Sequence, residues 1–386
     1  MSDYLKRAYA EIHLDRAKRN IEKIRTLLKG NTELMAVVKA NAYGHDDGVL
    51  PLYFQSLGIK YFAVSNIHEA ENLRKAGITG EILILGYTSP EYCKELYDYN
   101  IISTIVSYEH AEEMSQNAEQ PVRCHAAIDT GMGRIGIRTY DQTKCADEIE
   151  KISKLKNIAL EGIFTHLAAA DSYDEENVKY TENQRNFFLS VKKFLSDRGI
   201  SLKHTHYLNS AGGTFYADSE STLARFGIML YGLYPDVSLK LPFELEPVME
   251  LKAEVGYVNK IKKGSFVSYG RTFCAESDMT LAVLTIGYAD GYSRLLSSKA
   301  EVLIKGKRVK IVGRICMDQL MIDVTGTDVK PGDVATLIGI DGNEKITADE
   351  LATLYGTIGY EVVCGISKRV PRVIMNENQI ITVREY

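Results

Sequence analysis

A lysine flanked by small apolar residues is the first candidate for chemistry. Lys39 lies in AVVKANAYGH at 36–45, between Ala-Val-Val and Ala-Asn-Ala. Burial among such residues disfavours the ammonium form, which lowers the pKa of the lysine and supplies the neutral amine that Schiff-base chemistry needs. The competing interpretation is a lysine that only extends its charge to solvent from the end of a strand.

Groups that could hold a phosphate follow two later apolar runs. Ser210 comes with Gly212 and Gly213, and Gly227 stands two residues after Arg225. Glycines let backbone N–H groups approach an anion closely, although ordinary turns also use them. A lysine for a Schiff base, a phosphate cradle and an arginine together favour pyridoxal phosphate (PLP) as the cofactor.

Arg225 is the candidate to face the pyridine nitrogen of that cofactor. An arginine does not give up its proton, so the ring nitrogen would stay unprotonated. The weaker electron sink suits an enzyme that moves an α-proton and does little else. The alternative for Arg225 is a surface ion pair, which its place inside a strand-like run disfavours.

The histidines are less informative. His166 could be a ligand, a base or a core histidine, and no second ligand stands at a fixed spacing from it, so we expect no metal site. His204 and His206 alternate on the approach to a strand, where we expect them to face solvent or to pack.

Eight apolar runs in the first 235 residues could position these side chains. Most are unbroken, as is typical of strands buried on both faces. They lie at 34–40, 61–65, 81–86, 102–107, 123–129, 160–166, 206–210 and 222–227, and amphipathic segments at 15–29, 68–77, 142–155 and 181–199 alternate with them. The pattern predicts a (β/α)8 barrel of the TIM type, in which catalytic groups gather at the strand C-termini. A doubly wound sheet is the competitor, but no glycine-rich dinucleotide turn follows the first strand.

The pattern changes at 233–247, which holds three of the eight prolines. Beyond it the chain is rich in strand-like runs separated by turn signals, and only 346–355 looks helical, with Thr347 as its cap. We therefore predict a barrel domain at 1–237 and a mainly β domain at 238–386.

Composition excludes several classes of function. The net charge of −5 gives no global reason to bind nucleic acid or an anionic membrane. No apolar run is long enough to span a bilayer and the N-terminus lacks a signal sequence, so we expect a cytoplasmic protein. None of the six cysteines forms a Cys-x-x-Cys pair, which argues against structural zinc.

Ordered motifs across nearly the whole chain resemble those of the bacterial alanine racemase family. They are AVVKANAYGH at 36–45, DTGMGRIG at 129–136, FTHLAAAD at 164–171, NSAG at 209–212, RFGIMLYG at 225–232, SYGRTF at 268–273, IGYADGY at 286–292, GRICMDQ at 313–319 and GYEVVCGISKRVPR at 359–372. The resemblance implies a PLP-binding barrel followed by a β-domain, assembled head to tail as a homodimer with shared active sites. The implied activity is the interconversion of L- and D-alanine, which supplies D-alanine for peptidoglycan.

The resemblance also implies a role for each matching residue. Lys39 holds the cofactor and is one base, and Tyr269 from the partner subunit is the opposite base. The phosphate is held by Tyr43, Ser210, Gly227, Ile228 and Tyr360, with Asn209 beside them. Arg225 faces the pyridine nitrogen and His166 supports it. Arg134 and the backbone N–H of Met317 contact the carboxylate of the substrate, and Asp318 lies beside Met317. Tyr288 and Tyr360 narrow the entrance.

Two positions depart from the commonest family pattern. Ala127 stands where many members carry a modified lysine that positions the arginine corresponding to Arg134, and Arg271 stands where a small residue is frequent. A serine-preferring or broad-specificity racemase is therefore an alternative, although the bulky Tyr360 favours a substrate with a methyl side chain. A non-catalytic PLP-binding module and an amino-acid decarboxylase are further alternatives. The second domain disfavours the former and Arg225 the latter.

Overall fold

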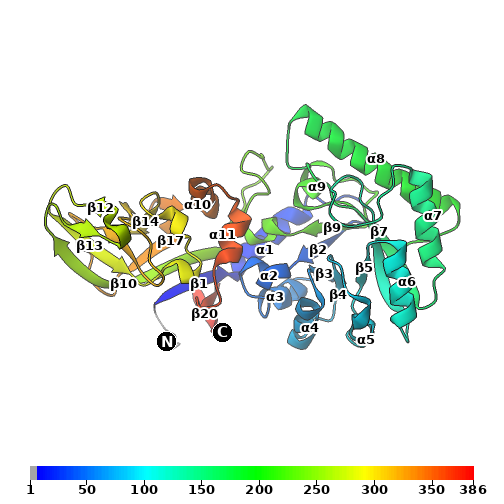
Figure 1. Cartoon of the computed structure of the whole chain (residues 1–386), viewed down its shortest axis with the longest axis horizontal. Helices are drawn as coiled ribbons and strands as arrows, with labels where there is room; N and C mark the ends of the chain where they lie inside the picture. The colour runs from blue at the N-terminus through cyan, green and yellow to red at the C-terminus, as the bar shows by residue number, and fades with distance from the viewer. Residues whose placement is uncertain (1–6) are drawn as a thin grey trace.

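The computed structural model describes residues 7–386 as two domains side by side along the long axis of the molecule (Figure 1). One is a barrel of parallel strands and the other is built mainly of antiparallel strands. None of the helices in this part of the chain combines the length and apolar character needed to cross a membrane.

Eight parallel strands form the barrel: β2 (Glu33–Val37), β3 (Tyr61–Val64), β4 (Glu81–Ile84), β5 (Ser103–Ile105), β6 (Val122–Ala127), β7 (Ile158–Phe164), β8 (His204–His206) and β9 (Leu223–Phe226). Neighbours in sequence pair within two four-stranded sheets, and β9 pairs with β2. Bridges between Leu83 and Ile102 and between Leu208 and Ala224 join the two sheets into a closed ring. The predicted barrel is therefore confirmed, and each predicted strand overlaps an observed one.

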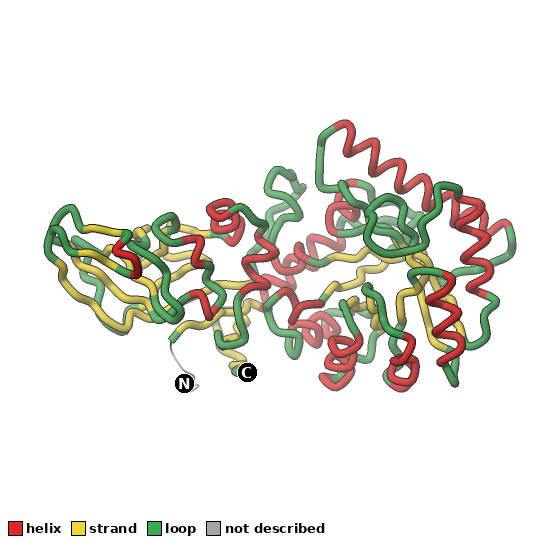
Figure 2. The backbone as a smooth tube through the Cα atoms, viewed as in Figure 1, coloured by secondary structure: helices red, strands yellow, loops and turns green. Residues whose placement is uncertain are grey.

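Helices cover the outside of this ring, as the red segments around the yellow strands show (Figure 2). They are α1 (Leu14–Arg25), α3 (Leu50–Ser56), α4 (Ile67–Ala76), α5 (Cys93–Asp98), α6 (Tyr108–Asn117), α7 (Gln142–Ser153) and α8 (Glu175–Asp197). Several begin at a side chain that accepts a hydrogen bond from the first turn, such as Asn66 before α4 and Asp141 before α7. The barrel strands are buried on both sides, which explains their unbroken apolar runs.

The second domain is built around a long strand, β10 (Met249–Ile261), which pairs with three others. The remaining strands are β11 (Phe266–Val267), β12 (Phe273–Cys274), β13 (Met279–Leu284), β14 (Glu301–Ile304), β15 (Lys307–Lys310), β16 (Leu320–Asp323), β17 (Val334–Asp341), β18 (Glu344–Ile346), β19 (Arg372–Asn376) and β20 (Gln379–Arg384). The first strand of the chain, β1 (Ala8–His13), lies between β10 and β19 in this sheet. Residues 8–13 therefore pair within the second domain, although the sequence analysis placed them with the barrel.

Two helices complete this domain, and only one was predicted. α10 (Ala348–Tyr355) begins after Thr347, whose side chain accepts a hydrogen bond from Glu350 N as expected. α11 (Gly359–Gly365) lies beside α2 (Lys39–Tyr43) of the barrel at the junction of the domains (Figure 1). The prediction of a single helix was wrong, because GYEVVCG combines glycine at both ends with two β-branched residues and its helix depends on packing.

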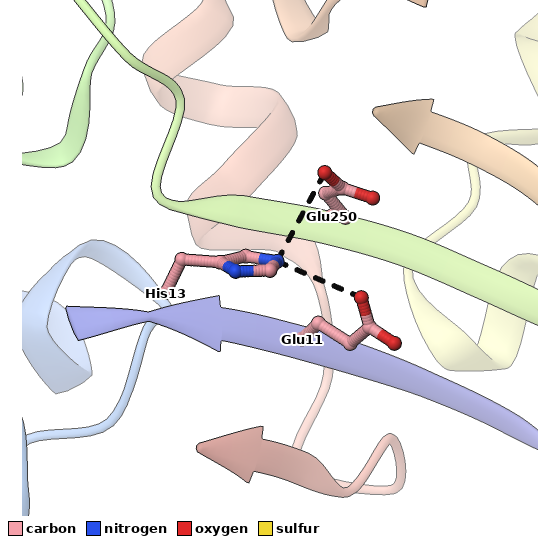
Figure 3. A group of neighbouring side chains, drawn as sticks. All are labelled: Glu11, His13 and Glu250. Atoms are coloured by element: carbon pink, nitrogen blue, oxygen red, sulfur yellow. Dashed lines mark ion pairs between the residues drawn. The ribbon is translucent and has the colours of Figure 1, made fainter. Parts of the chain in front are cut away.

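A cluster of charged side chains lies where the chain passes from β1 into α1 (Figure 3). His13 Nε2 is 3.6 Å from Glu11 Oε2 and 3.9 Å from Glu250 Oε1. These three residue types can bind a metal ion, but both carboxylates already have cationic partners. Lys252 Nζ is 2.6 Å from Glu11 Oε2, and Arg16 Nη2 is 2.7 Å from Glu250 Oε1. The cluster therefore acts as an ion-pair network that ties β1 and α1 to β10.

Candidate active site

A cavity of about 540 Å³ opens at the C-terminal ends of the barrel strands. Barrel enzymes place their active sites at this end. The cavity brings together every candidate residue that the sequence analysis placed on the barrel, and Tyr360 joins them from α11. These residues are Lys39, Tyr43, Arg134, His166, Asn209, Ser210, Arg225, Gly227, Ile228 and Tyr360.

The remaining candidates lie on the second domain, away from this cavity. Tyr269, Met317 and Asp318 line a separate cavity of about 670 Å³, and Tyr269 is 67% exposed. Tyr288 begins a short 3₁₀ helix and is also exposed. Within residues 7–386 of one chain, Lys39 and Tyr269 therefore do not line the same cavity.

Lys39 lies just after β2, at the start of a short left-handed turn, α2 (Lys39–Tyr43). The φ angles of Ala40, Asn41, Ala42 and Tyr43 are 53°, 56°, 51° and 53°. Each such residue costs roughly 1–2 kcal/mol relative to a right-handed conformation, so surrounding contacts must hold the turn. Arg372 supplies two of them, through hydrogen bonds of 2.9 Å and 2.8 Å from Nε and Nη2 to Gly44 O.

The environment of Lys39 favours its neutral amine. Burial lowers the pKa of Lys39, and the positive charge of Arg134 lowers it further. The side chain lines the cavity and is half-buried, so the interpretation of a lysine that only reaches for solvent is wrong. The lowered pKa confirms what the flanking apolar residues predicted.

Hydroxyl and backbone N–H groups converge at another wall of the cavity. Gly227 N donates to Ser210 Oγ at 3.1 Å. Asn209 caps α9 (Ser210–Phe215), because its Oδ1 accepts from Gly212 N at 2.7 Å. A Cβ at position 227 would lie 2.5 Å from the hydroxyl of Tyr43, so glycine is what lets this hydroxyl approach the backbone. Burial raises the pKa of Tyr43 and keeps its hydroxyl protonated.

Arg225 is buried, and its charge faces no carboxylate in the described part of the chain. Its Nη1 donates to His206 Nδ1 at 2.7 Å and to His206 O at 3.1 Å, and Nη2 donates to Thr165 O at 2.7 Å. Burial, with the nearby charge of Arg134, lowers the pKa of Arg225 to about 9. The surface ion pair considered for Arg225 is therefore wrong.

The residue that supports Arg225 is not the one expected. The family resemblance implied this role for His166, which lines the cavity but forms no hydrogen bond with Arg225 in the structure. His206 bonds Arg225 instead and is fully buried on β8, so of its two expected placements, facing solvent or packing, the structure confirms packing. The usable signal was its place at the end of the strand that neighbours β9. Burial lowers the pKa of His166 to about 3, and the charges of Arg225 and Arg134 act in the same direction.

The loop after β6 presents Arg134 to the cavity. Asp129 Oδ1 accepts hydrogen bonds of 3.0 Å from Gly131 N and Gly133 N, which fixes the loop. Ala127 also lines the cavity and offers no polar group to Arg134. Among residues 7–386 the Arg134 guanidinium has neither a hydrogen bond nor an ion pair. On the second domain, Arg271 lies over the ring of Phe266 at 5.3 Å.

Comparison with known proteins matches both domains to the same protein family. Residues 12–235 match the N-terminal domain of alanine racemase and residues 248–374 match its C-terminal domain. The chain is 42% identical to an alanine racemase of Clostridium tetani over the full length of both proteins.

Solved structures agree with this result. An alanine racemase of Bacillus anthracis with bound L-Ala-P superposes with a TM-score of 0.93 at 35% identity, covering 100% of this chain and 99% of that one. A histidine racemase of Leuconostoc mesenteroides superposes with a TM-score of 0.87 at 28% identity, covering 96% and 98%. Full-length identity above 40% and a match in each domain establish that this chain belongs to the alanine racemase family.

Proposed function

We propose that this protein is a PLP-dependent racemase that interconverts L-alanine and D-alanine. The observation that carries the proposal is the cavity at the barrel mouth. Its walls hold Lys39, whose pKa is lowered, and Arg225, which is buried and has no carboxylate partner. Ser210 and Gly227 add hydroxyl and backbone N–H groups that can bind a phosphate. A cytoplasmic location and the supply of D-alanine for peptidoglycan are parts of the proposal that rest on the family alone.

The residues of the cavity fit the cofactor. Lys39 Nζ would hold it covalently, because burial favours the neutral amine. Tyr43, Ser210, Gly227, Ile228 and Tyr360 would hold its phosphate, since the lack of a Cβ at Gly227 lets the Tyr43 hydroxyl approach the backbone there, and Asn209 would flank them. Arg225 would present N–H groups to the pyridine nitrogen without releasing a proton. When bound, PLP supplies an electron sink that acidifies the α-hydrogen of the substrate.

Racemisation requires a proton to leave one face of the α-carbon and another to arrive at the opposite face. Lys39 Nζ would move the proton on one face. Tyr269 Oη of the partner subunit would act on the other, because in one chain Tyr269 is exposed and lies outside the cavity. Lysine and tyrosine can each accept and donate a proton, so either group can act as base on its own face and as acid for the reverse reaction. The proposed assembly is a homodimer with shared sites.

The second domain would complete the substrate pocket of the partner. Met317 N–H and Arg134 would bind the substrate carboxylate, and Tyr288 with Tyr360 would narrow the entrance. Asp318 would lie beside Met317 in this pocket and place a negative charge there. Its Oδ1 lies 2.8 Å from Nη2 of Arg369, which fixes the carboxylate in place.

A serine-preferring or broad-specificity racemase is the second candidate. The histidine racemase is the specific reason to test it. That protein superposes on this chain with a TM-score of 0.87, and histidine has a larger side chain than alanine. Tyr360 supports alanine, since burial beside Tyr43 holds a bulky ring at the cavity wall, 6.2 Å from the Tyr43 ring centroid.

The deciding experiment offers single amino acids to the purified, PLP-loaded protein. L-alanine, L-serine and L-histidine are incubated separately, and the D-enantiomers are measured by chiral chromatography. We expect fast conversion of alanine and slow conversion of the other two. Comparable conversion of serine would move the assignment to a broad-specificity racemase, and no conversion of any substrate would refute the proposed activity.

A further inference from the structure

Arg225 stands at one end of a row of buried imidazole rings inside the barrel. Its Nη1 bonds His206 Nδ1 at 2.7 Å, and His206 Nε2 lies 2.9 Å from His125 Nδ1. The three residues belong to the strands β9, β8 and β6, and both histidines are fully buried. No part of the reaction proposed above uses His125.

The hydrogen bonds allow only one arrangement of protons along this row. Arginine donates and never accepts, so His206 Nδ1 must be the acceptor. A neutral His206 then carries its hydrogen on Nε2 and donates it to His125 Nδ1, which leaves the hydrogen of His125 on its Nε2. Burial keeps both rings neutral, because it lowers the pKa of His206 well below its ordinary value and that of His125 to about 3.

Two features of the surroundings indicate that the role of His125 is to accept the hydrogen bond from His206. Its Nε2 is buried and has no hydrogen-bond partner among residues 7–386, so part of its own hydrogen-bonding capacity is lost. The site also needs glycine on the next strand. A Cβ at Gly162 would lie 2.6 Å from His204 O and 3.0 Å from both Cδ2 and Nε2 of His125, so glycine leaves room for the strand pairing and for the ring.

Without His125, His206 would lose the acceptor that selects its tautomer. A buried N–H with no acceptor is unfavourable, so the ring would be driven to reorient or to place its hydrogen on Nδ1. Either change removes the ring nitrogen that accepts from Arg225 Nη1. The guanidinium would keep its bonds to Thr165 O and His206 O but lose the ring nitrogen, which is its shortest contact to His206.

We propose that His125 is a positioning residue, which fixes the tautomer and orientation of His206 and thereby the direction in which Arg225 presents its N–H groups to the cavity. The inference rests on the proposed function, in which Arg225 faces the pyridine nitrogen. With Arg225 and His206, His125 forms a group of three residues, and it comes from β6, on which no side chain had been assigned a role.

The first test measures the tautomer in the cofactor-free protein. Long-range ¹⁵N–¹H correlation spectra of histidine-labelled protein distinguish protonated from unprotonated ring nitrogens, and His206→Gln identifies the signals of His206. We expect the Nε2–H form in the parent protein and in His125→Asn, whose amide oxygen can replace the accepting nitrogen. We expect its loss in His125→Phe. An unchanged His206 tautomer in folded His125→Phe would overturn the proposal.

The second test connects the row to the reaction. For alanine racemisation we expect His125→Phe to lower kcat about 10- to 100-fold, by analogy with the loss caused by removing the hydrogen-bond partner of a metal-binding histidine. His125→Asn should recover most of this loss.

His110→Phe is the matched control, because His110 is a buried neutral histidine that bonds Thr88 O at 2.9 Å and has no link to Arg225. An equal loss of kcat in His110→Phe would assign the effect to general destabilisation and overturn the proposal. The two inferences fail separately, because the tautomer is read without cofactor, whereas an inactive parent protein refutes only the proposed function.

Discussion

Lys39 shows how much of the proposed chemistry depends on one side chain and its surroundings. Replacing it with alanine removes both the covalent hold on PLP and one proton-transfer group. We therefore expect Lys39→Ala to lose alanine racemisation by about 10²–10⁴-fold or more. Borohydride reduction followed by intact-mass measurement should find a covalent cofactor adduct on the parent protein and none on Lys39→Ala. A reducible adduct retained in Lys39→Ala would show that another lysine holds the cofactor.

The lowered pKa of Lys39 predicts the pH at which the protein captures PLP. Only the neutral amine reacts, so the rate of capture by cofactor-free protein should rise with pH. The midpoint should lie below the ordinary lysine value of 10.5, because burial and Arg134 both disfavour the ammonium form. Removing the charge in Arg134→Gln should move the midpoint upward. Stopped-flow absorbance across a pH series measures both, and a midpoint at or above 10.5 in the parent protein would contradict this account.

At the level of single residues, sequence was informative where the signal is local. Lys39 is surrounded by its apolar neighbours in the sequence. Ser210 and Gly227 are residue types that let a backbone N–H approach an anion closely. His206 could not be assigned in this way, because its partners Arg225 and His125 come from neighbouring strands. Which of several buried histidines meets a given arginine depends on register, which the residues around each histidine do not contain.

The left-handed turn that carries Lys39 depends on its contact with α11. Gly44 ends this turn with φ +80°, and a Cβ there would lie 2.2 Å from Val363 O. We expect Gly44→Ala to push the turn away from α11 and to weaken PLP binding by at least about tenfold, since loss of even 1.4 kcal/mol has this effect. Fluorescence titration of the cofactor-free protein measures the Kd.

Gly58→Ala is the matched control for this change. Gly58 has nearly the same φ, +84°, but only the far end of Arg25 lies within 4 Å of its added Cβ. It should lower the free energy of unfolding by about 1 kcal/mol through backbone strain and leave the Kd for PLP unchanged. An equal loss of affinity in the two variants would show that strain alone, and not the contact with α11, explains the result.

At the level of elements, the barrel could be predicted, whereas the place of β1 in the second domain could not. The eight strands are buried on both faces, and this leaves apolar runs that need no partner to be recognised. β1 was placed in the wrong domain because its pairing with β10 joins Ala8 to Ala253, far along the chain. The domain boundary at 237/238 stays a prediction.

The whole molecule should be sensitive to acid before its carboxylates titrate. Burial lowers the pKa of six of the eight histidines: His45, His110, His125, His166, His204 and His206. Below the ordinary value of 6.5 the unfolded chain binds protons that the folded chain excludes. Stability from these groups is therefore present above pH 6.5 and is lost as pH falls.

For one fully buried histidine the loss between neutral pH and pH 5.5 is about 1.4 kcal/mol. We expect urea unfolding, followed by circular dichroism, to give a clearly lower free energy of unfolding at pH 5.5 than at pH 7.5. The difference should shrink in His110→Gln, which removes one of these groups. Equal free energies at the two pH values would mean that the six rings are not excluded from protonation in the folded state.

Shared active sites predict that two inactive proteins can restore each other. If Lys39 of one subunit works with Tyr269 of the partner subunit, a heterodimer of Lys39→Ala and Tyr269→Phe chains has one site with both bases and one with neither. Random association of equal amounts makes half of the dimers mixed, so activity should recover to about a quarter of the parent value. Two affinity tags allow the heterodimer to be purified, and each homodimer serves as its own control. A purified heterodimer as inactive as its parents would place both bases in one chain, and the exposed Tyr269 on the second domain would then need another explanation.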